Sequence, residues 1–553
     1  MRFRAVVNRL VARLQRDWDK LATTKLMEKL DTVELPEHQR AVVDDLDLLG
    51  RASMFHLVSM AATMPGIRTL AGWLADQAQA SRAIERTAAI NALAPLRDER
   101  LRFYSLAREV GESTGDPDSF VKWASGEPWL DSRKWLLTWA NLSVAVLVVC
   151  ILGVIAGALG LISPELLRAS AIGIFVLAGF NFVLTSVMLG PAHQIFSVAM
   201  ANRQAVGNYQ ELFAAAEWLP TDESAEGCLA RIRESILTHK CAATVGMQKM
   251  QRVAGAGGLR QSAGTFLLYL PLQAFGLWDV RVLNRLEKWQ SEFGPHVESW
   301  FDALGELESL LSLAALRDEY PLWATPVWTD NSDKEVVKAT GIGHPLLSDD
   351  ARVCNDVSVG PPGTILLVTG SNMSGKSTML RSVGLNVALA GTGAPVCASY
   401  FQLPSVELAT SIRVRDNLSE GVSFYMAELQ RLKSVVDQSR RLADEPDRVV
   451  LFLLDEILQG TNSRERQIAV VQVLENLMES KAIGAITTHD LELADEPKLM
   501  SIATPVHFRE TIRPDAEGEE QMTFDYKMRE GVSPTTNALR LLEMVGLGTS
   551  SKK

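Results

Sequence analysis

The sequence predicts an α-helical core domain that carries a two-helix transmembrane hairpin and is followed by an α/β domain. Its 553 residues suggest roughly two to four domains. With 47% hydrophobic and 22% charged residues, the chain is neither disordered nor fibrous. Two long uncharged runs predict the hairpin. A change near residue 339, from helical periodicity to strands that alternate with helices, predicts the α/β domain.

Charge and cysteine usage exclude several classes of protein. The net charge is −11, and residues 339–553 contribute much of it, with 21 basic and 28 acidic side chains. This balance argues against a generally basic nucleic-acid coat. The five cysteines are scattered without a CxxC pair, which argues against a disulfide framework or a zinc site and fits a reducing compartment.

The hairpin is predicted between residues 135 and 192. No formal charge occurs from Trp135 to Pro164 or from Ala169 to Ala192, and a helix needs about 20 apolar residues to cross the hydrocarbon core. We therefore expect spans over about 136–162 and 169–190, joined by a short loop that contains Arg168. The alternative is a buried hairpin in a soluble core, which is less favoured because soluble helices of this length usually carry a polar stripe.

The rest of the chain before residue 339 is predicted to be helical. The expected parts are an N-terminal helical part (1–134), the hairpin (135–192), a second helical part (193–338) and the α/β domain (339–553). Residues 1–21 have apolar side chains at helical spacing and arginines on the opposite face, so they either lie on an anionic membrane surface or pack on the protein. The segment Gln261–Trp278 also lacks charge, but it is short and contains Pro271, so we expect a core helix.

A nucleotide-binding loop is predicted at the start of the α/β domain. A buried-strand pattern from Thr364 leads into a complete GxxxxGK[ST] sequence, and a helical segment follows. In such a loop, glycines allow backbone N–H groups to wrap phosphates, the lysine reaches the β- and γ-phosphates, and the next hydroxyl binds Mg²⁺. The residues expected to bind nucleotide are Gly370, Ser371, Asn372, Met373, Ser374, Gly375, Lys376, Ser377 and Thr378.

Two later strands complete the predicted catalytic group. The apolar strand that begins at Val449 ends in Asp455 and Glu456. At this distance after the loop, the first carboxylate is expected to hold Mg²⁺ together with Ser377, and the second to activate the attacking water. Another apolar strand ends at His489, where an imidazole can sense the γ-phosphate. We therefore expect Lys376, Glu456 and His489 to be catalytic, with ATP and Mg²⁺ as cofactors.

These motifs together resemble the MutS mismatch-repair ATPase family, a branch of the ABC-type ATPases. The similar segments are GIGHPLL (341–347), NDVSV (355–359), GSNMSGKST (370–378), APVCA (394–398), DNLSEGVSFYMAE (416–428), DEILQGTNSRER (455–466), TTHD (487–490) and GVSPTTNALRLLEMVGL (531–547). Upstream, 44–76 and 83–93 are similar to the family's helical core. The resemblance implies a MutS domain V-like ATPase and a homodimer in which Ser423 and Gly421 of one subunit complete the ATP site of the other.

The sequence also departs from that family. We expect no mismatch-reading domain, a missing or reduced C-terminal dimerisation module, and a membrane hairpin where the family carries lever helices and a DNA clamp. The basic residues Arg133, Lys134 and Arg203 flank the hairpin and give a modest positive-inside signal. Two spans place the parts before and after the hairpin on the same side, and the predicted ATP site makes that side the cytosol. The predicted location is therefore the bacterial inner membrane, with membrane lipid as a partner.

The predicted function is that of a membrane-anchored MutS-like ATPase whose ATP cycle drives conformational switching in DNA binding, repair or recombination. The acidic α/β domain gives the DNA role no electrostatic support. The alternative is therefore a scaffold or assembly factor that acts on a protein client without DNA. An ABC-type transporter is disfavoured, because two spans are few for a translocation pathway and LSEGVS (418–423) differs from the transporters' LSGGQ.

Overall fold

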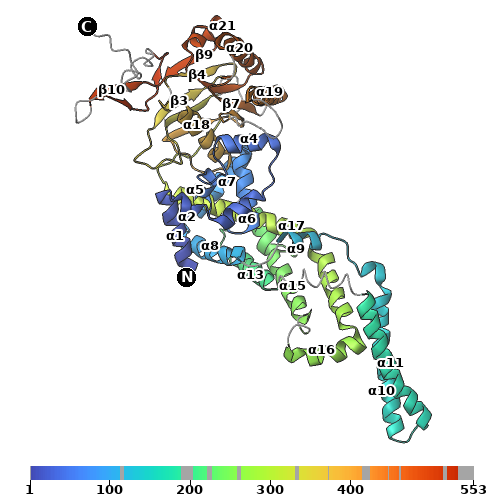
Figure 1. Cartoon of the computed structure of the whole chain (residues 1–553). Helices are drawn as coiled ribbons and strands as arrows, with labels where there is room; N and C mark the ends of the chain where they lie inside the picture. Colours follow the sequence, from blue (N-terminus) through green and yellow to red (C-terminus); the bar gives the residue numbers. More distant parts are fainter. Residues whose placement is uncertain are drawn as a thin grey trace, which may run out of the picture.

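The molecule consists of three parts in a row. The computed structural model describes residues 2–112, 117–188, 203–220, 227–257, 259, 263–329, 336–371, 373–413, 424–445, 448–459, 462–514 and 520–533. An α/β domain lies at one end, a helical core lies in the middle, and a hairpin of two long helices extends from the far end (Figure 1). The order and type of the predicted parts are confirmed, namely a helical region, a pair of apolar helices and an α/β domain.

Segments from both sides of the hairpin build the helical core. Before it come α1 (Arg2–Gln15), α2 (Trp18–Leu21), α3 (Thr24–Asp31), α4 (Glu37–Asp45), α5 (Met54–Val58), α6 (Met64–Ala75), α7 (Ala80–Leu93), α8 (Arg97–Glu112), α9 (Pro117–Ala124) and η1 (Asp131–Arg133). After it come α13 (Arg203–Ala214), α14 (Cys228–Arg233), η3 (Glu234–Thr238), α15 (Ala243–Gly257), α16 (Ala263–Gly276) and α17 (Trp278–Glu319). Helix α17 is the spine, because α6, α7, α9 and α15 all pack along it.

The N-terminal helix α1 packs on the protein. Its Arg9 Nε donates to the Ser59 carbonyl at 3.0 Å, and Arg13 Nε donates to the Leu57 carbonyl at 2.7 Å. Arg13 is fully buried and also pairs with Glu319 at 3.1 Å. Of the two interpretations that the sequence left open, the structure therefore selects packing on the helical core, because the arginines bind backbone carbonyls of that core.

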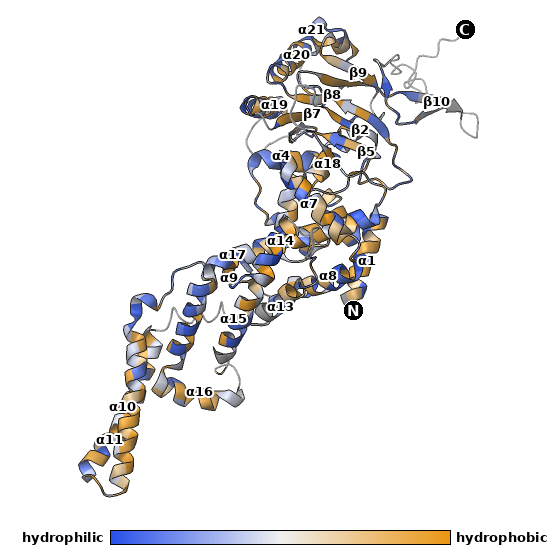
Figure 2. Ribbon diagram, turned by 180° about the vertical axis from the view of Figure 1, so that it is seen from behind, coloured by the Kyte–Doolittle hydropathy of each residue, from blue (hydrophilic) through white to orange (hydrophobic). Residues whose placement is uncertain are grey.

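Helices α10 (Trp135–Ala158) and α11 (Pro164–Met188) form the hairpin. Both are long and apolar enough to cross a membrane. Most of their side chains face outward, and Figure 2 shows both helices as strongly hydrophobic. The alternative interpretation, a hairpin buried in the protein's own soluble core, is therefore wrong. The expectation that Arg168 lies in the connecting loop is also wrong. Proline suits the first turn of a helix, and Pro164 begins α11 four residues before this arginine.

The segment that was expected to be a core helix is exposed. It forms α16, whose Leu267 side chain is 76% exposed, and whose neighbours are α10, α11 and the start of α17. The expectation is wrong because these neighbours cover only one side of α16. Helix α17 then departs at 86° to it. A residue at the bend, Leu277, adopts a left-handed φ of +48°.

A six-stranded sheet forms the centre of the α/β domain, in the order β12-β9-β4-β8-β7-β6. All neighbouring pairs are parallel except β12 with β9. The strands are β4 (Ile365–Thr369), β6 (Val406–Ser411), β7 (Val449–Asp455), β8 (Ile483–Thr488), β9 (Ala503–His507) and β12 (Arg529–Glu530). The helices are α18 (Lys376–Gly391), α19 (Phe424–Leu442), α20 (Ser463–Glu479), η6 (Leu491–Asp495) and α21 (Pro497–Met500).

A second sheet has the order β1-β5-β2-β3 and lies next to the central one. Its strands are β1 (Val327–Trp328), β2 (Val337–Ile342), β3 (Asn355–Val359) and β5 (Tyr400–Leu403), while β10 (Glu510–Pro514) and β11 (Glu520–Phe524) form a separate antiparallel pair. Because β1 already pairs with β5, strand structure begins about ten residues before the expected boundary at residue 339.

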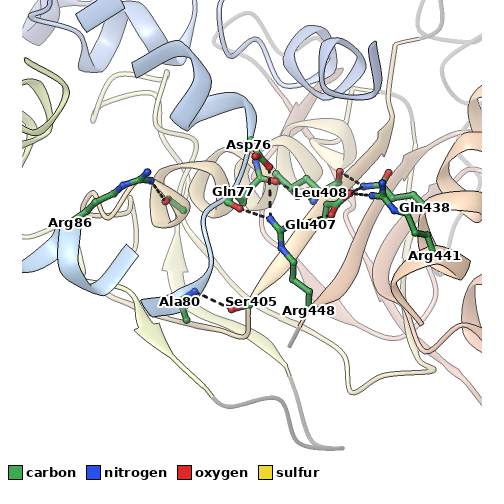
Figure 3. A network of polar contacts seen from close by, with 11 residues as sticks. Asp76, Gln77, Ala80, Arg86, Ser405, Glu407, Leu408, Gln438, Arg441 and Arg448 are labelled. Carbon is green, nitrogen blue, oxygen red and sulfur yellow. Dashed lines mark hydrogen bonds and ion pairs between the residues drawn. The ribbon is translucent and has the colours of Figure 1, made fainter. Parts of the chain in front are cut away.

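A polar network joins the helical core to the α/β domain (Figure 3). The side-chain oxygen of Gln77 accepts a hydrogen bond from a backbone N–H of β6 at 3.2 Å. The backbone carbonyl of Gln77 accepts a second hydrogen bond from the Arg448 side chain. Arg448 also lies 3.4 Å from Glu407 of β6. On α7, Arg86 donates to the carbonyl of Gly391 at 3.2 Å. Since Gly391 ends α18, the helical core is hydrogen-bonded to the helix that begins at the predicted nucleotide loop.

Candidate functional site

The predicted nucleotide loop connects the central strand β4 to helix α18. Gly370 follows β4 with a φ of +142°, and a Cβ at this position would lie 2.6 Å from the carbonyl oxygen of Phe508. Gly375 has a φ of +107° and precedes the first residue of α18. Glycine adopts such backbone angles without strain. The loop therefore turns sharply and presents the N-terminus of α18, where backbone N–H groups favour an anion.

Lys376 is the first residue of α18 and is only 3% exposed. Its Nζ donates to the carbonyl oxygens of Gly370 and Ser371, each at 2.9 Å. The same Nζ lies 3.1 Å from Oε1 of Glu456. Three oxygens thus hold the positive charge of Lys376 beside the loop.

Asp455 and Glu456 lie where β7 and β8 end side by side. The hydroxyl of Thr487 on β8 donates to Asp455 Oδ1, and it accepts from the backbone N–H of Glu456 at 3.0 Å. Glu456 has a left-handed φ of +47°. A residue other than glycine rarely adopts this angle, and such strain is common at functional sites. The adjoining parallel strands therefore place both carboxylates at the same edge of the sheet as Lys376.

His489 reaches this group through Glu456. Its Nδ1 lies 3.6 Å from Glu456 Oε2, the oxygen that also accepts from Gln459 Nε2 at 2.8 Å. Glu456 thus has Lys376 beside one carboxylate oxygen, with Gln459 and His489 beside the other. This arrangement orients the carboxylate from both sides.

Lys376, Asp455 and Glu456 line a cavity of about 790 Å³, whereas His489 approaches Glu456 without lining that cavity. A volume of this size is typical of small-molecule sites. The predicted site residues that line the cavity are Met373, Gly375, Lys376, Ser377, Thr378, Asp455 and Glu456. Gly370, Ser371 and Ser374 belong to the same loop. Asn372, Gly421 and Ser423 lie outside the described residues.

Twelve of the nineteen residues of the cavity wall were not predicted as site residues. Among them are His344, Phe508 and Tyr526. Tyr526 packs beside the loop, because a Cβ on Gly375 would lie 3.1 Å from its ring. Burial lowers the pKa of His344 to about 4, so its imidazole is neutral at neutral pH. His344 lies in the family-like segment GIGHPLL, whereas no spacing signal marks the two aromatic residues.

The oxygen groups in the cavity suit Mg²⁺ when phosphate is also present. Within the described part of the chain, no three His, Cys, Asp or Glu side chains are grouped closely enough to hold a metal ion. Ser377 and Asp455 line the same cavity and offer a hydroxyl and a carboxylate. Mg²⁺ is commonly bound by one or two such protein groups, with phosphate oxygens and water as its other ligands.

A comparison with known proteins assigns the family of this domain. Residues 366–551 match the family model of MutS domain V. The DNA mismatch repair protein MSH6 of Arabidopsis thaliana is 30% identical over 270 residues, and the DNA mismatch repair protein MutS of Chlorobaculum parvum is 30% identical over 253 residues. The α/β domain of this chain is therefore a MutS domain V. The resemblance found in its motifs is thereby confirmed.

The family-model match includes most of the residues that line the cavity. The domain V match starts within β4 and includes the loop, both carboxylates and His489. The aligned segments cover 46% and 44% of this chain, but only 20% of the Arabidopsis protein and 27% of the Chlorobaculum protein. The chain thus shares a minor part of the length of these MutS relatives.

Proposed function

We propose that this MutS-family chain is a membrane-anchored ATPase that binds Mg²⁺-ATP in the 790 Å³ cavity and hydrolyses it to drive a conformational change. The observation that carries the proposal is the arrangement at this cavity. The Lys376 ammonium, the Ser377 hydroxyl and the carboxylates of Asp455 and Glu456 all line it at the N-terminus of one helix.

The cavity residues fit a magnesium-bound nucleoside triphosphate. The hydroxyl of Ser374 is buried in the loop and has no hydrogen-bond partner among the described residues. A phosphate oxygen held by the loop would accept from it. The first turn of α18 contains no acidic residue, so no carboxylate of that turn competes with a bound anion. The buried ammonium of Lys376 supplies the opposite charge.

Each residue then has a defined role in hydrolysis. Lys376 would exchange its loop carbonyls and Glu456 for phosphate oxygens, which releases the Glu456 carboxylate. Ser377 and Asp455 would hold Mg²⁺, which supplies charge neutralisation at the phosphates. Glu456 would orient the attacking water and accept its proton. His489, next to Glu456, would contact the γ-phosphate side of the site.

We further propose that two copies form the complete site. The MutS resemblance assigns Ser423 and Gly421 to the signature loop that completes the ATP site of the opposite subunit. ATP would then favour the closed dimer because it contacts both copies only in that state. Through the contacts of Gln77 and Arg86 with the α/β domain, closure would move the helical core.

The membrane location is supported by the hairpin. Both helices are apolar over 24 residues, and only 11% of the most apolar window of each is buried within the protein. Exposed apolar surface of this extent is unfavourable in water. Insertion of the hairpin in a bacterial inner membrane, with the α/β domain in the cytosol, removes that surface from water and leaves the cavity accessible to ATP.

Two kinds of macromolecule, DNA and protein, are candidates for the client on which the ATPase acts. The MutS relatives are named as DNA mismatch repair proteins, which favours DNA. The net charge of −7 over residues 339–553, from 21 basic and 28 acidic side chains, instead favours a protein client. Binding of labelled mismatched and branched duplexes at low salt separates them, because DNA binding through phosphate contacts weakens steeply as salt rises.

Measurement of ATP hydrolysis by Glu456→Gln tests the proposal. The amide keeps the size of the side chain but cannot accept a proton, so we expect turnover to fall at least about 100-fold while ATP binding remains. Glu475→Gln is the matched control, because this glutamate of the same domain pairs with Lys498 and does not line the cavity. Wild-type turnover in Glu456→Gln would contradict the assignment of the cavity as the hydrolytic site.

A further inference from the structure

Helix α16 exposes an entirely apolar surface. No charged residue occurs from Gln261 to Trp278. The exposed large side chains of the helix are Phe266, Leu267, Leu268, Leu270 and Leu272. A helix on an aqueous surface normally turns its polar face outward. The outward face of α16 therefore requires a medium other than water.

The polar groups of α16 are used to attach it to the hairpin. Ser143 of α10 donates to the carbonyl of Phe275 at 2.7 Å, and Asn181 of α11 donates to the carbonyl of Ala274 at 2.7 Å. Both hairpin side chains are fully buried. The C-terminal carbonyls of α16 are thus capped by the hairpin itself, which fixes the height of α16 along α10 and α11.

This height coincides with a group of aromatic and basic side chains. Arg281 donates to the carbonyl of Ala140 at 2.9 Å, one turn before Ser143. At the same end of the hairpin, Arg133 stacks on Trp129 at 4.3 Å, and Arg285 stacks on Trp278 at 5.8 Å. Tryptophan and arginine gather where a bilayer meets water. The attachment point of α16 therefore lies near the predicted boundary between membrane and cytosol.

The hairpin extends beyond this point by about the depth of a membrane. From Ser143 to the end of α10 at Ala158 there are 16 residues, which correspond to roughly 24 Å of helix. Together with the connecting turn, this approaches the hydrocarbon thickness of about 30 Å. Figure 1 shows the same relation, with α16 lying across the molecule and the hairpin tip extending past it.

We infer that α16 lies in the plane of the bilayer at its cytosolic surface, with its leucine face against the lipid acyl chains. The occupant of this face is lipid because the face is continuous with the outward apolar surfaces of α10 and α11, on which it packs. The inference rests on the proposed insertion of the hairpin and extends it. Because α16 leads into α17 through an 86° bend, the helix would also set how the spine of the core stands on the membrane.

The depth of α16 is measurable by fluorescence quenching in liposomes. The five native cysteines are replaced by alanine, single cysteines are introduced by Leu267→Cys or Leu270→Cys, and each is labelled with the fluorophore NBD. Liposomes of phosphatidylcholine and phosphatidylglycerol carry a nitroxide either near the headgroup or deep in the acyl chain. Ile172→Cys on α11, roughly 14 Å from the level of Asn181, is the deep reference, and the exposed Glu298→Cys on α17 is the aqueous reference.

We expect the α16 labels to be quenched at least twofold more by the headgroup nitroxide than by the deep one, with the reverse order for Ile172→Cys. No quenching on α16 together with deep quenching at Ile172→Cys would overturn the inference and leave the membrane anchor intact. Deep quenching on α16 would make it a re-entrant segment and would also overturn the in-plane placement. Absence of quenching at every position would contradict the membrane anchor itself.

Discussion

Strand β7 and helix α10 are both built from long apolar runs, yet the structure treats them in opposite ways. Leu451, Phe452 and Leu453 of β7 are fully buried, because β6 and β8 flank the strand and helices cover the sheet. On α10, Val149 is 68% exposed. The same kind of sequence thus yields a protein core in one region and an outward surface in the other. An apolar run shows that water must be excluded, whereas the neighbouring elements decide what excludes it.

Polar groups differ between the two regions as well. In the α/β domain they collect at the carboxyl ends of strands, where Asp455 and Glu456 line an open cavity. In the hairpin the buried polar side chains bind one another, where Asn181 accepts from Trp139 and donates to Ser143. The first arrangement keeps charge available for a ligand. The second satisfies these buried groups within the protein.

The largest expected effect is a loss of ATP hydrolysis that leaves the hairpin and its membrane retention unchanged. Lys376→Ala should reduce ATP hydrolysis about 100- to 1,000-fold, because it removes the buried cation that faces the phosphates. Membrane retention should not change, since the hairpin is remote from the cavity. Phosphate release and membrane fractionation measure the two properties. Lys498→Ala, an exposed lysine of the same domain, should alter neither. Loss of membrane retention in Lys376→Ala would show that the regions are not independent.

The next largest effect is expected where the helical core contacts the α/β domain, at the joint formed by Asp45 and its hydrogen-bond donors. Asp45 is 1% exposed and accepts from Thr410 Oγ1 at 2.7 Å, from Arg413 N at 2.9 Å and from Arg431 at 2.9 Å. Asp45→Ala leaves these donors unpaired, so we expect about 3 kcal/mol of destabilisation in denaturant unfolding. Asp19→Ala removes an exposed ion pair and should cost under about 1 kcal/mol. Equal effects would show that the joint contributes little.

A pH-dependent effect is expected inside the spine. Burial raises the pKa of Glu308 on α17 to about 7, from an unfolded value of 4.5. The folded state therefore holds this proton more tightly than the unfolded state does. The protonated carboxyl contributes its full stabilisation of the folded state below pH 4.5, and this contribution is lost as the pH rises through 7. Glu308→Gln cannot ionise. Relative to wild type, it should gain about 2 kcal/mol between pH 5 and pH 8, measured as unfolding free energy.

The control for this effect is Glu298→Gln, an exposed glutamate on the same helix. Burial also lowers the pKa of His56 and of His344 to about 4, which acts in the opposite direction below pH 6.5. Both histidines are present in wild type and variant, so their contribution cancels in the difference. A difference between Glu308→Gln and wild type that does not change with pH would contradict the raised pKa.

The smallest expected effect concerns packing within the hairpin. A Cβ on Gly157 would lie 2.7 Å from the Cβ of Leu167, whereas a Cβ on Gly179 would meet nothing within 4 Å. Gly157→Leu should therefore separate α10 from α11 and cost about 1 to 2 kcal/mol. Gly179→Leu should cost little. Thermal unfolding of the detergent-solubilised protein compares the two, and ATP hydrolysis should be unaltered in both. Equal melting temperatures for the two variants would contradict the close packing of α10 against α11 at Gly157.

Local sequence patterns predicted much of the candidate site, because its main groups lie within or next to regular elements. The glycines, Lys376 and Ser377 follow β4, and Asp455 with Glu456 lies at the end of β7. Both strands pair in parallel with β8 between them, which suffices to bring these groups to one edge. The opposite wall of the cavity was not predicted. Phe508 and Tyr526 come from segments next to the C-terminal strands, and neither has a spacing that relates it to the loop.

The sequence by itself determined the glycine-rich loop between β4 and α18, the similarity to MutS domain V and the two apolar helices, because each is recorded in residues close together along the chain. Only the tertiary structure decided where apolar surface is covered. It packed α1 onto the core through Arg9 and Arg13, and it left α16 exposed although that segment was predicted to be buried. The physical reason is that burial depends on neighbours from distant parts of the chain, whose positions no local pattern contains.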